Sequence, residues 1–246
     1  MTSIAPSEPI ALVSAGRTLS ARLHRPVGEP VGSIVVIHPH PGHGGHMDHS
    51  VVRATAERAA AAGLAAMRVD VSGVRESEGD VHDWESHLQD LDAASDLAST
   101  FAPAKPRYGG GFSYGSRLWM ERMLRPPAPP VVGLLLLAPA TRVPQSSRDF
   151  GDLLLGRTIR DAAIDPSSLD RLRRLAVPAR LIVGERDNVA PPEELRAHAG
   201  PAITIEVIEG VNHFFSRATG AGATAYDVLI PAIDRALAAL LTPRRK

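Results

Sequence analysis

RYGGGFSYGS, residues 107–116, sets one serine between two glycines in the pattern Gly111-x-Ser113-x-Gly115. This pattern is typical of a sharp turn between a strand and a helix, where residues without a Cβ let neighbouring backbone pass close by. A helix-like run, residues 116–125, follows directly. The pattern therefore predicts a serine hydroxyl lifted clear of a sheet. The same pattern also occurs in ordinary glycine-rich turns, so the position of the stretch within the chain has to decide between the two interpretations.

The rest of the chain alternates between apolar runs typical of strands and amphipathic runs typical of helices. Strands are expected at 10–14 and 19–24, as an edge hairpin, at 33–37, as a fully buried run, and at 64–70, 131–138, 179–184 and 203–208. Helices are expected at 48–62, from 84 to about 103, and at 116–125, 192–198 and 222–241. This alternation predicts an α/β fold with a mostly parallel sheet covered on both faces, in a single domain of residues 1–246. Residues 141–174 interrupt it and are predicted to form a short cap.

Composition narrows the classes of function. The 27 basic and 27 acidic residues leave no net charge, so nothing indicates a nucleic-acid or anionic-membrane partner. No apolar run approaches the ~20 residues that span a bilayer, and the first residues lack the regions of a signal peptide, so a cytoplasmic location is expected. The sequence has no cysteine, which excludes disulfides, thiolate metal sites and a cysteine nucleophile. Whether the chain forms a homo-oligomer stays open.

Three residues suited to nucleophilic catalysis each follow a predicted strand. Ser113 follows the glycine run, Asp187 follows residues 179–184, and His213 follows residues 203–208. Because the carboxyl ends of parallel strands meet at one edge of a sheet, their side chains are expected to lie together. The order nucleophile, acid, base is that of an α/β serine hydrolase, in which the imidazole takes the hydroxyl proton and the carboxylate orients the imidazole. Taken singly, Asp187 could be a turn residue and His213 a surface loop residue.

The sequence resembles the α/β-hydrolase superfamily, and in particular the small dienelactone-hydrolase-like enzymes that carry a His-Pro-His-Pro loop. That loop is HPHPGHGGHMD, residues 38–48. The likeness continues through RVDVSGVRESEG (68–79), the serine turn, GERD (184–187) and NHFF (212–215). It covers nearly the whole chain from about residue 10 onward, and the set of motifs is more specific than any one of them.

The resemblance implies roles for five residues. It implies a catalytic triad of Ser113, Asp187 and His213 and an oxyanion hole made by two backbone N–H groups, those of Tyr114 and His40. The prolines on both sides of His40 have no N–H, so His40 is the donor in its loop. The implied activity is cleavage of carboxylic esters by water through an acyl-enzyme on Ser113, with thioesters and amides as alternative small-molecule acyl substrates. Neither a metal nor another cofactor is expected.

Three other interpretations stay open. Five of the ten histidines lie within residues 38–49 and could form a metal site, although no cluster of carboxylates accompanies them. Gly109, Gly111 and Gly115 loosely match a dinucleotide-binding fingerprint, but the strand at 131–138 ends without the acidic residue that would bind a ribose. The chain could also be a non-catalytic binding module on a hydrolase fold. Labelling of Ser113 by a fluorophosphonate separates an enzyme from such a module.

Overall fold

The computed structural model describes residues 7–141, 167–219 and 222–242. The strands are β1 (Glu8–Ser14), β2 (Arg17–His24), β3 (Gly32–Ile37), β4 (Leu64–Val69), β5 (Arg107–Phe112), β6 (Val131–Leu137), β7 (Ala179–Gly184) and β8 (Ile203–Ile208). The helices are α1 (Ser50–Ala61), α2 (Trp84–Thr100), α3 (Tyr114–Leu124), α6 (Ser167–Arg174), α7 (Pro192–Ala197) and α8 (Tyr226–Leu241), with a 3-10 turn, η1, at Pro41–His43.

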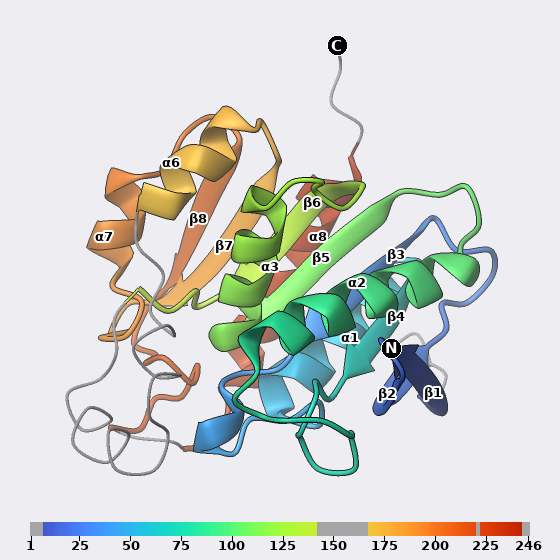
Figure 1. Ribbon diagram of the computed structural model, residues 1–246. Coiled ribbons are helices and arrows are strands. Elements are labelled where there is room, and N and C mark those ends of the chain that lie inside the picture. Colours follow the sequence, from blue (N-terminus) through green and yellow to red (C-terminus); the bar gives the residue numbers. More distant parts are fainter. Residues whose placement is uncertain (1–6, 142–166, 220–221, 243–246) are drawn as a thin grey trace.

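The strands form one eight-stranded sheet in the order β1-β2-β4-β3-β5-β6-β7-β8 (Figure 1). β2 pairs antiparallel with both β1 and β4, and the remaining neighbours are parallel. Helices α2, α3 and α6 lie along one face, and α1 and α8 contact each other on the opposite face. The expected α/β fold with a mostly parallel, covered sheet is therefore confirmed.

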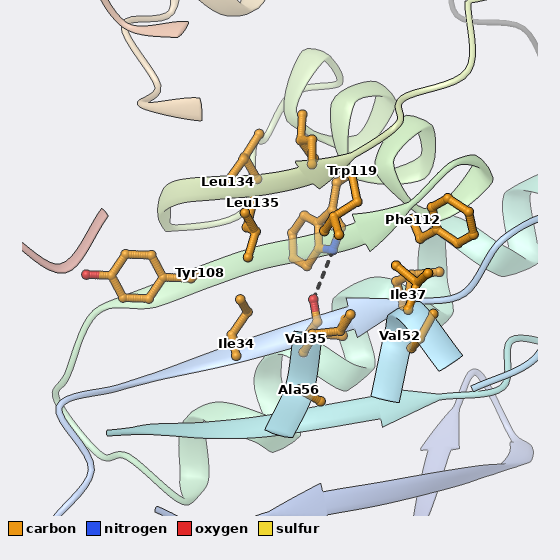
Figure 2. Packing of buried hydrophobic residues seen from close by; sticks show 14 of the residues in the cluster. Ile34, Val35, Ile37, Val52, Ala56, Tyr108, Phe112, Trp119, Leu134 and Leu135 are labelled. Atoms are coloured by element: carbon orange, nitrogen blue, oxygen red, sulfur yellow. Dashed lines mark hydrogen bonds between the residues drawn. The ribbon is translucent and has the colours of Figure 1, made fainter. Parts of the chain in front are cut away.

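The centre of the sheet is β3, which is buried along its whole length between β4 and β5. Its β-branched residues pack against helices on both faces, as expected for a strand of a covered parallel sheet. Figure 2 shows this core, where the Trp119 indole of α3 donates a hydrogen bond of 3.2 Å to the carbonyl of Val35. The helix that follows the serine is thereby attached to the central strand by packing and by a polar contact.

The glycines of β5 make room for α3 in a strand with few large side chains. A Cβ on Gly109 would lie 2.6 Å from the Trp119 ring, so the indole occupies the space of the missing side chain. A Cβ on Gly110 points the other way and would lie 3.2 Å from the side chain of Ile34. This close approach explains how a strand with three consecutive glycines stays buried between β3 and β6.

Element boundaries differ from the sequence-based expectation at a few points. Helix α3 begins at Tyr114, two residues earlier than predicted, because the sharp backbone turn is confined to Ser113. Helix α1 begins at Ser50 and not at residue 48, because the His49 side chain accepts a hydrogen bond from the N–H of Val51 and caps the helix. Of the predicted cap, residues 142–166 lie outside the described residues, while α6 packs on α3. Within the described ranges, no helix is both long enough and apolar enough to cross a bilayer.

Candidate active site

Ser113 occupies a strained turn between β5 and α3. Its backbone has φ 53° and ψ −109°, a conformation that costs a residue with a side chain ~1–3 kcal/mol. Two hydrogen bonds hold it: the Ser113 N–H donates to the carbonyl of Leu137 at 2.8 Å, and the Ser113 carbonyl accepts from the N–H of Arg117 at 3.1 Å. The turn projects the hydroxyl away from the sheet, as the Gly-x-Ser-x-Gly pattern predicts.

The two glycines around Ser113 are required by close backbone contacts. A Cβ on Gly111 would lie 2.3 Å from the carbonyl carbon of Gly115, inside the turn itself. A Cβ on Gly115 would lie 2.3 Å from the carbonyl oxygen of Ile37 and 2.9 Å from that of His38. The turn therefore packs directly on the end of β3 and the start of the histidine-rich loop. These contacts are internal to the fold, which argues against a dinucleotide-binding role for the same glycines.

Asp187 and His213 lie beside Ser113 and complete a hydrogen-bonded chain. The Ser113 hydroxyl oxygen is 2.9 Å from His213 Nε2, and His213 Nδ1 is 2.9 Å and 3.0 Å from the two carboxylate oxygens of Asp187. With its proton on Nδ1, the imidazole donates to Asp187 and accepts from Ser113. Ser113, His213 and Asp187 expose 8%, 7% and 3% of their surface, so the carboxylate is the most deeply enclosed of the three. The structure thus brings together the three residues predicted to meet.

Backbone contacts set the positions of Asp187 and His213. Asp187 Oδ1 also accepts from the N–H groups of Val189 and Ala190, at 2.9 Å and 2.8 Å, which orients the carboxylate within its turn. Asn212 holds the loop of His213, because its Oδ1 accepts from the N–H groups of Phe214 and Ser216 at 3.0 Å and 3.1 Å. The two turns also touch: a Cβ on Gly184 would lie 2.6 Å from the Asn212 carbonyl oxygen.

Aromatic rings enclose the imidazole of His213. The rings of Phe112 and Phe214 lie with their centroids 5.5 Å from that of His213, one tilted and one edge-on. Phe112 also contacts the ring of His49 at 5.1 Å and that of Phe215 at 5.9 Å. This apolar surround lowers the local dielectric around the proton-accepting nitrogen and strengthens its hydrogen bonds.

The structure places the histidine-rich loop against the turn of Ser113. The His40 ring lies 5.1 Å from the Tyr114 ring, edge to face. Tyr114 is the first residue of α3, where a backbone N–H has no acceptor within the helix. His40 precedes η1, and its Nδ1 accepts from the N–H of Gly42 at 3.0 Å. The two residues expected to donate N–H groups to an oxyanion are therefore neighbours in space.

The histidines of this loop serve its backbone. His46 and His49 accept through Nδ1 from N–H groups two residues on, as His40 does, and His38 contacts the Pro39 carbonyl at 2.7 Å. Burial lowers the pKa of His38 to about 3 and those of His40 and His49 to about 4, so these imidazoles are neutral at pH 7. Among the described residues, no group of three or more His, Cys, Asp or Glu is placed to hold a metal ion.

One buried contact near the site has no clear signal in the sequence. The hydroxyl of Tyr114 donates to His87 Nδ1 in a short hydrogen bond, and His87 Nε2 donates to the carbonyl of Ser72 at 3.0 Å. Burial lowers the pKa of His87, which keeps the ring neutral and able to accept the tyrosine proton. The sequence indicates only that His87 is buried, because it lies one helical turn before Leu91 on the buried face of α2. The contact fixes the side chain of the residue directly after Ser113.

A mostly parallel eight-stranded sheet with a serine on a turn of positive φ between strand and helix is the architecture of an α/β-hydrolase, and the family match over residues 28–169 shows that the chain is a hydrolase enzyme of this superfamily. A family model described as serine aminopeptidase, S33, matches residues 28–169, more than half of the chain, and the protein belongs to this family of serine hydrolases.

Solved structures give the same fold. Est1E from Butyrivibrio proteoclasticus with bound ferulic acid is 20% identical with a TM-score of 0.75, covering 94% of this chain and 99% of that one. An α/β serine hydrolase without lid from Xanthomonas campestris is 19% identical with a TM-score of 0.71, covering 99% and 100%. An α/β serine hydrolase homologue from Coxiella burnetii is 21% identical with a TM-score of 0.69, covering 97% and 100%. No curated protein matches the sequence at a significant level.

Proposed function

We propose that the protein hydrolyses carboxylic esters through an acyl-enzyme on Ser113. The observation that carries the proposal is the continuous hydrogen-bonded chain from the Ser113 hydroxyl through His213 to Asp187, with both contacts to the imidazole at 2.9 Å. A serine hydroxyl is a weak nucleophile until a neighbouring base removes its proton, and this arrangement supplies that base in the tautomer that accepts.

The proposed reaction has two halves. Ser113 Oγ attacks the ester carbonyl while its proton passes to His213 Nε2, and the Asp187 carboxylate stabilises the imidazolium. The N–H groups of Tyr114 and His40 donate to the oxyanion, where each donor contributes ~3 kcal/mol to the transition state. The alcohol leaves with the proton from Nε2. Water, activated by the same nitrogen, then hydrolyses the acyl-enzyme and regenerates Ser113.

Esters are proposed ahead of amides. A structural neighbour from Pyrococcus furiosus that is described as an esterase, with a TM-score of 0.64, supports this choice because it has the same fold. The description of the matching family as a serine aminopeptidase favours a second candidate, cleavage of aminoacyl amides by the same three residues. A panel of p-nitrophenyl esters of graded chain length, run beside aminoacyl p-nitroanilides, separates the two candidates by their values of kcat/KM.

Replacement of Ser113 by alanine tests the proposal. Ser113→Ala is expected to lower kcat by ~10³-fold or more and to abolish labelling by a fluorophosphonate, without unfolding the protein. Ser99→Ala is a matched control, because that hydroxyl donates to the carbonyl of Asp96 at the end of α2, and it should retain full activity. Retention of most of the esterase rate in Ser113→Ala would refute the assignment. Folded wild-type protein that takes up no fluorophosphonate would favour a non-catalytic binding module.

A further inference from the structure

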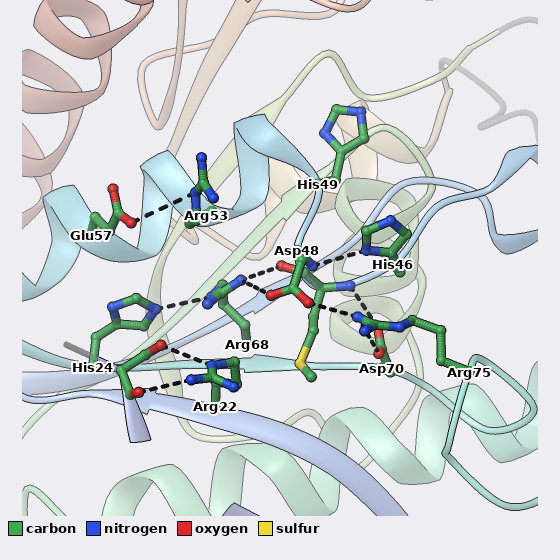
Figure 3. A network of polar contacts seen from close by, with 12 residues as sticks. Arg22, His24, His46, Asp48, His49, Arg53, Glu57, Arg68, Asp70 and Arg75 are labelled. Carbon is green, nitrogen blue, oxygen red and sulfur yellow. Dashed lines mark hydrogen bonds and ion pairs between the residues drawn. The ribbon is translucent and has the colours of Figure 1, made fainter. Parts of the chain in front are cut away.

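A fully buried arginine lies beneath the histidine-rich loop. Arg68 sits in the apolar strand β4, and its side chain is only 2% exposed. A guanidinium stays charged in proteins, so burial requires partners for its N–H groups. Figure 3 shows these partners: Nε donates to His24 Nε2 at 3.0 Å, and one terminal nitrogen donates to the carbonyl of Met47 at 2.6 Å and to Asp48 Oδ1 at 2.9 Å. Two of the three contacts are to the end of the loop.

The same segment of the loop is held by a second set of charges. The other carboxylate oxygen of Asp48 accepts from Arg75 at 2.7 Å (Figure 3). The buried carboxylate of Asp70, just after β4, accepts from the N–H of Met47 at 2.5 Å. Both backbone polar groups of Met47 are thus bound by ionised side chains from β4 and its end. Charge-assisted hydrogen bonds of this kind are about twice as strong as neutral ones.

The loop keeps its local shape through hydrogen bonds within itself, but these bonds do not attach it to the sheet. Between its anchored ends it contains two prolines, three glycines and a 3-10 turn of three residues with backbone hydrogen bonds of its own, and three of its histidines bond to backbone within the loop. At the other end, His38 Nε2 accepts from the N–H of Val71 at 3.3 Å, again from the segment after β4. The position of His40 over the turn of Ser113 therefore depends on anchors at both ends of the loop, and Arg68 is a buried anchor that contacts both Met47 and Asp48.

We propose that Arg68 is a positioning residue that holds the loop of residues 38–49, and with it the N–H of His40, in place beside Ser113. This inference rests on the proposed function, in which that N–H stabilises an oxyanion. A displacement of ~1 Å in a group that meets the transition state lowers a rate by ~10²-fold. Loss of the anchor should therefore act on kcat and leave substrate binding nearly unchanged.

Arg68→Met tests the anchor, because methionine keeps much of the apolar volume and removes all three contacts. We expect kcat to fall by ~10- to 100-fold and KM to stay within about threefold, with partial recovery in Arg68→Lys, which restores the charge. Arg58→Met is the matched control: Arg58 bonds Asp234 through two nitrogens at 2.7 Å and 2.9 Å, joining α1 to α8 away from the loop. Its kcat should equal that of the wild type.

Hydrogen exchange of the backbone supplies a readout that does not depend on catalysis. In Arg68→Met, exchange should rise in peptides covering residues 38–49 and not in those covering β6 and β7. A variant with the kcat of the wild type and unchanged protection of the loop would overturn the proposal. A uniform rise in hydrogen exchange across the sheet would also overturn it, because it would show general destabilisation. If Arg68→Met does not fold, Asp48→Ala at this half-buried position removes the carboxylate that Arg68 binds in the loop and gives the same two readouts, and unchanged kcat and loop protection would again overturn the proposal. An active Ser113→Ala would refute the proposed function alone, because exchange in the loop reports on the anchor separately.

Discussion

The replacement of Gly115 by alanine sets two physical effects against each other. Gly115 is the second residue of α3, and no left-handed backbone is required there, so helix propensity alone would make Gly115→Ala stabilising by ~1 kcal/mol. The new Cβ, however, would lie 2.3 Å from the carbonyl oxygen of Ile37, where real contacts stay above 3.0 Å. The turn and the end of β3 must therefore separate by at least 0.7 Å.

The clash should decide the outcome. Overpacking of a well-packed site costs ~1–3 kcal/mol, and the cost should lie at ~2–3 kcal/mol here because the Cβ meets rigid backbone. After the gain of ~1 kcal/mol in helix propensity, the free energy of unfolding is expected to fall by ~1–2 kcal/mol. The same separation moves Ser113 away from the loop that carries His40, so kcat should fall by ~10²-fold. Urea unfolding and kcat for a p-nitrophenyl ester measure the two effects. Gly110→Ala is the control, because its Cβ meets only side chains, at 3.2 Å or more. A Gly115→Ala protein that is more stable than the wild type and fully active would refute the reasoning.

Two further substitutions test the acid and a buried charge. Asp187→Asn should lower kcat by ~10³- to 10⁴-fold, because the imidazole of His213 loses the carboxylate that orients it. Stability should change little, because an amide oxygen can still accept from the N–H groups of Val189 and Ala190. A loss of kcat of less than tenfold would contradict this prediction. Burial raises the pKa of Asp70 from 3.8 to about 6 despite the hydrogen bond from the Met47 N–H and the nearby positive charge of Arg75, and Asp48 adds to the rise. The folded protein therefore binds the proton of the Asp70 carboxyl more tightly than the unfolded chain does. As the pH rises from about 4 to 6, the free energy of unfolding of the wild type should fall by ~3 kcal/mol relative to that of Asp70→Asn. Urea unfolding of both proteins at pH 4 and pH 7 measures the difference, and a constant difference would show that Asp70 does not titrate in this range.

The elements and the site differ in how far local sequence determines them. Strands β7 and β8 match their predicted bounds residue for residue, because each is a short apolar run between turn residues. Helix α8 begins at Tyr226, four residues later than predicted, because Thr224 pairs with Ser216 in an isolated bridge that continues the loop of His213. Apolar periodicity identifies an element well, but a tertiary contact at its end sets where it begins.

The meeting of Ser113, Asp187 and His213 was predictable for a topological reason. Each comes directly after a strand, and the carboxyl ends of parallel strands lie at one edge of the sheet, so the order of the chain sufficed. The network around Arg68 was not predictable in this way. The residues of this network come from β2, from the loop before α1 and from the turn after β4, and no spacing in the sequence relates them. An arginine inside an otherwise apolar strand is the one local sign that such partners exist.

The geometry of the site comes mostly from backbone hydrogen bonds at the strand ends. The hydroxyl of Ser116, three residues after Ser113, lies within hydrogen-bonding distance of two carbonyl oxygens, that of Gly111 at 2.7 Å and that of Leu137 at 3.0 Å. It therefore attaches the start of α3 to the ends of β5 and β6. Asp187 is oriented by two N–H groups of its own turn, and Asn212 closes the turn of His213 in the same way. Because a backbone group cannot change its rotamer, these contacts fix the three side chains of the proposed triad before any substrate arrives. The loop of His40 differs, since its far end is held by charged side chains, which a single substitution can remove. The hydrogen-bonded chain of Ser113, His213 and Asp187 should therefore keep its geometry when Arg68 is replaced, while the loop that carries the proposed oxyanion donor His40 loses its position.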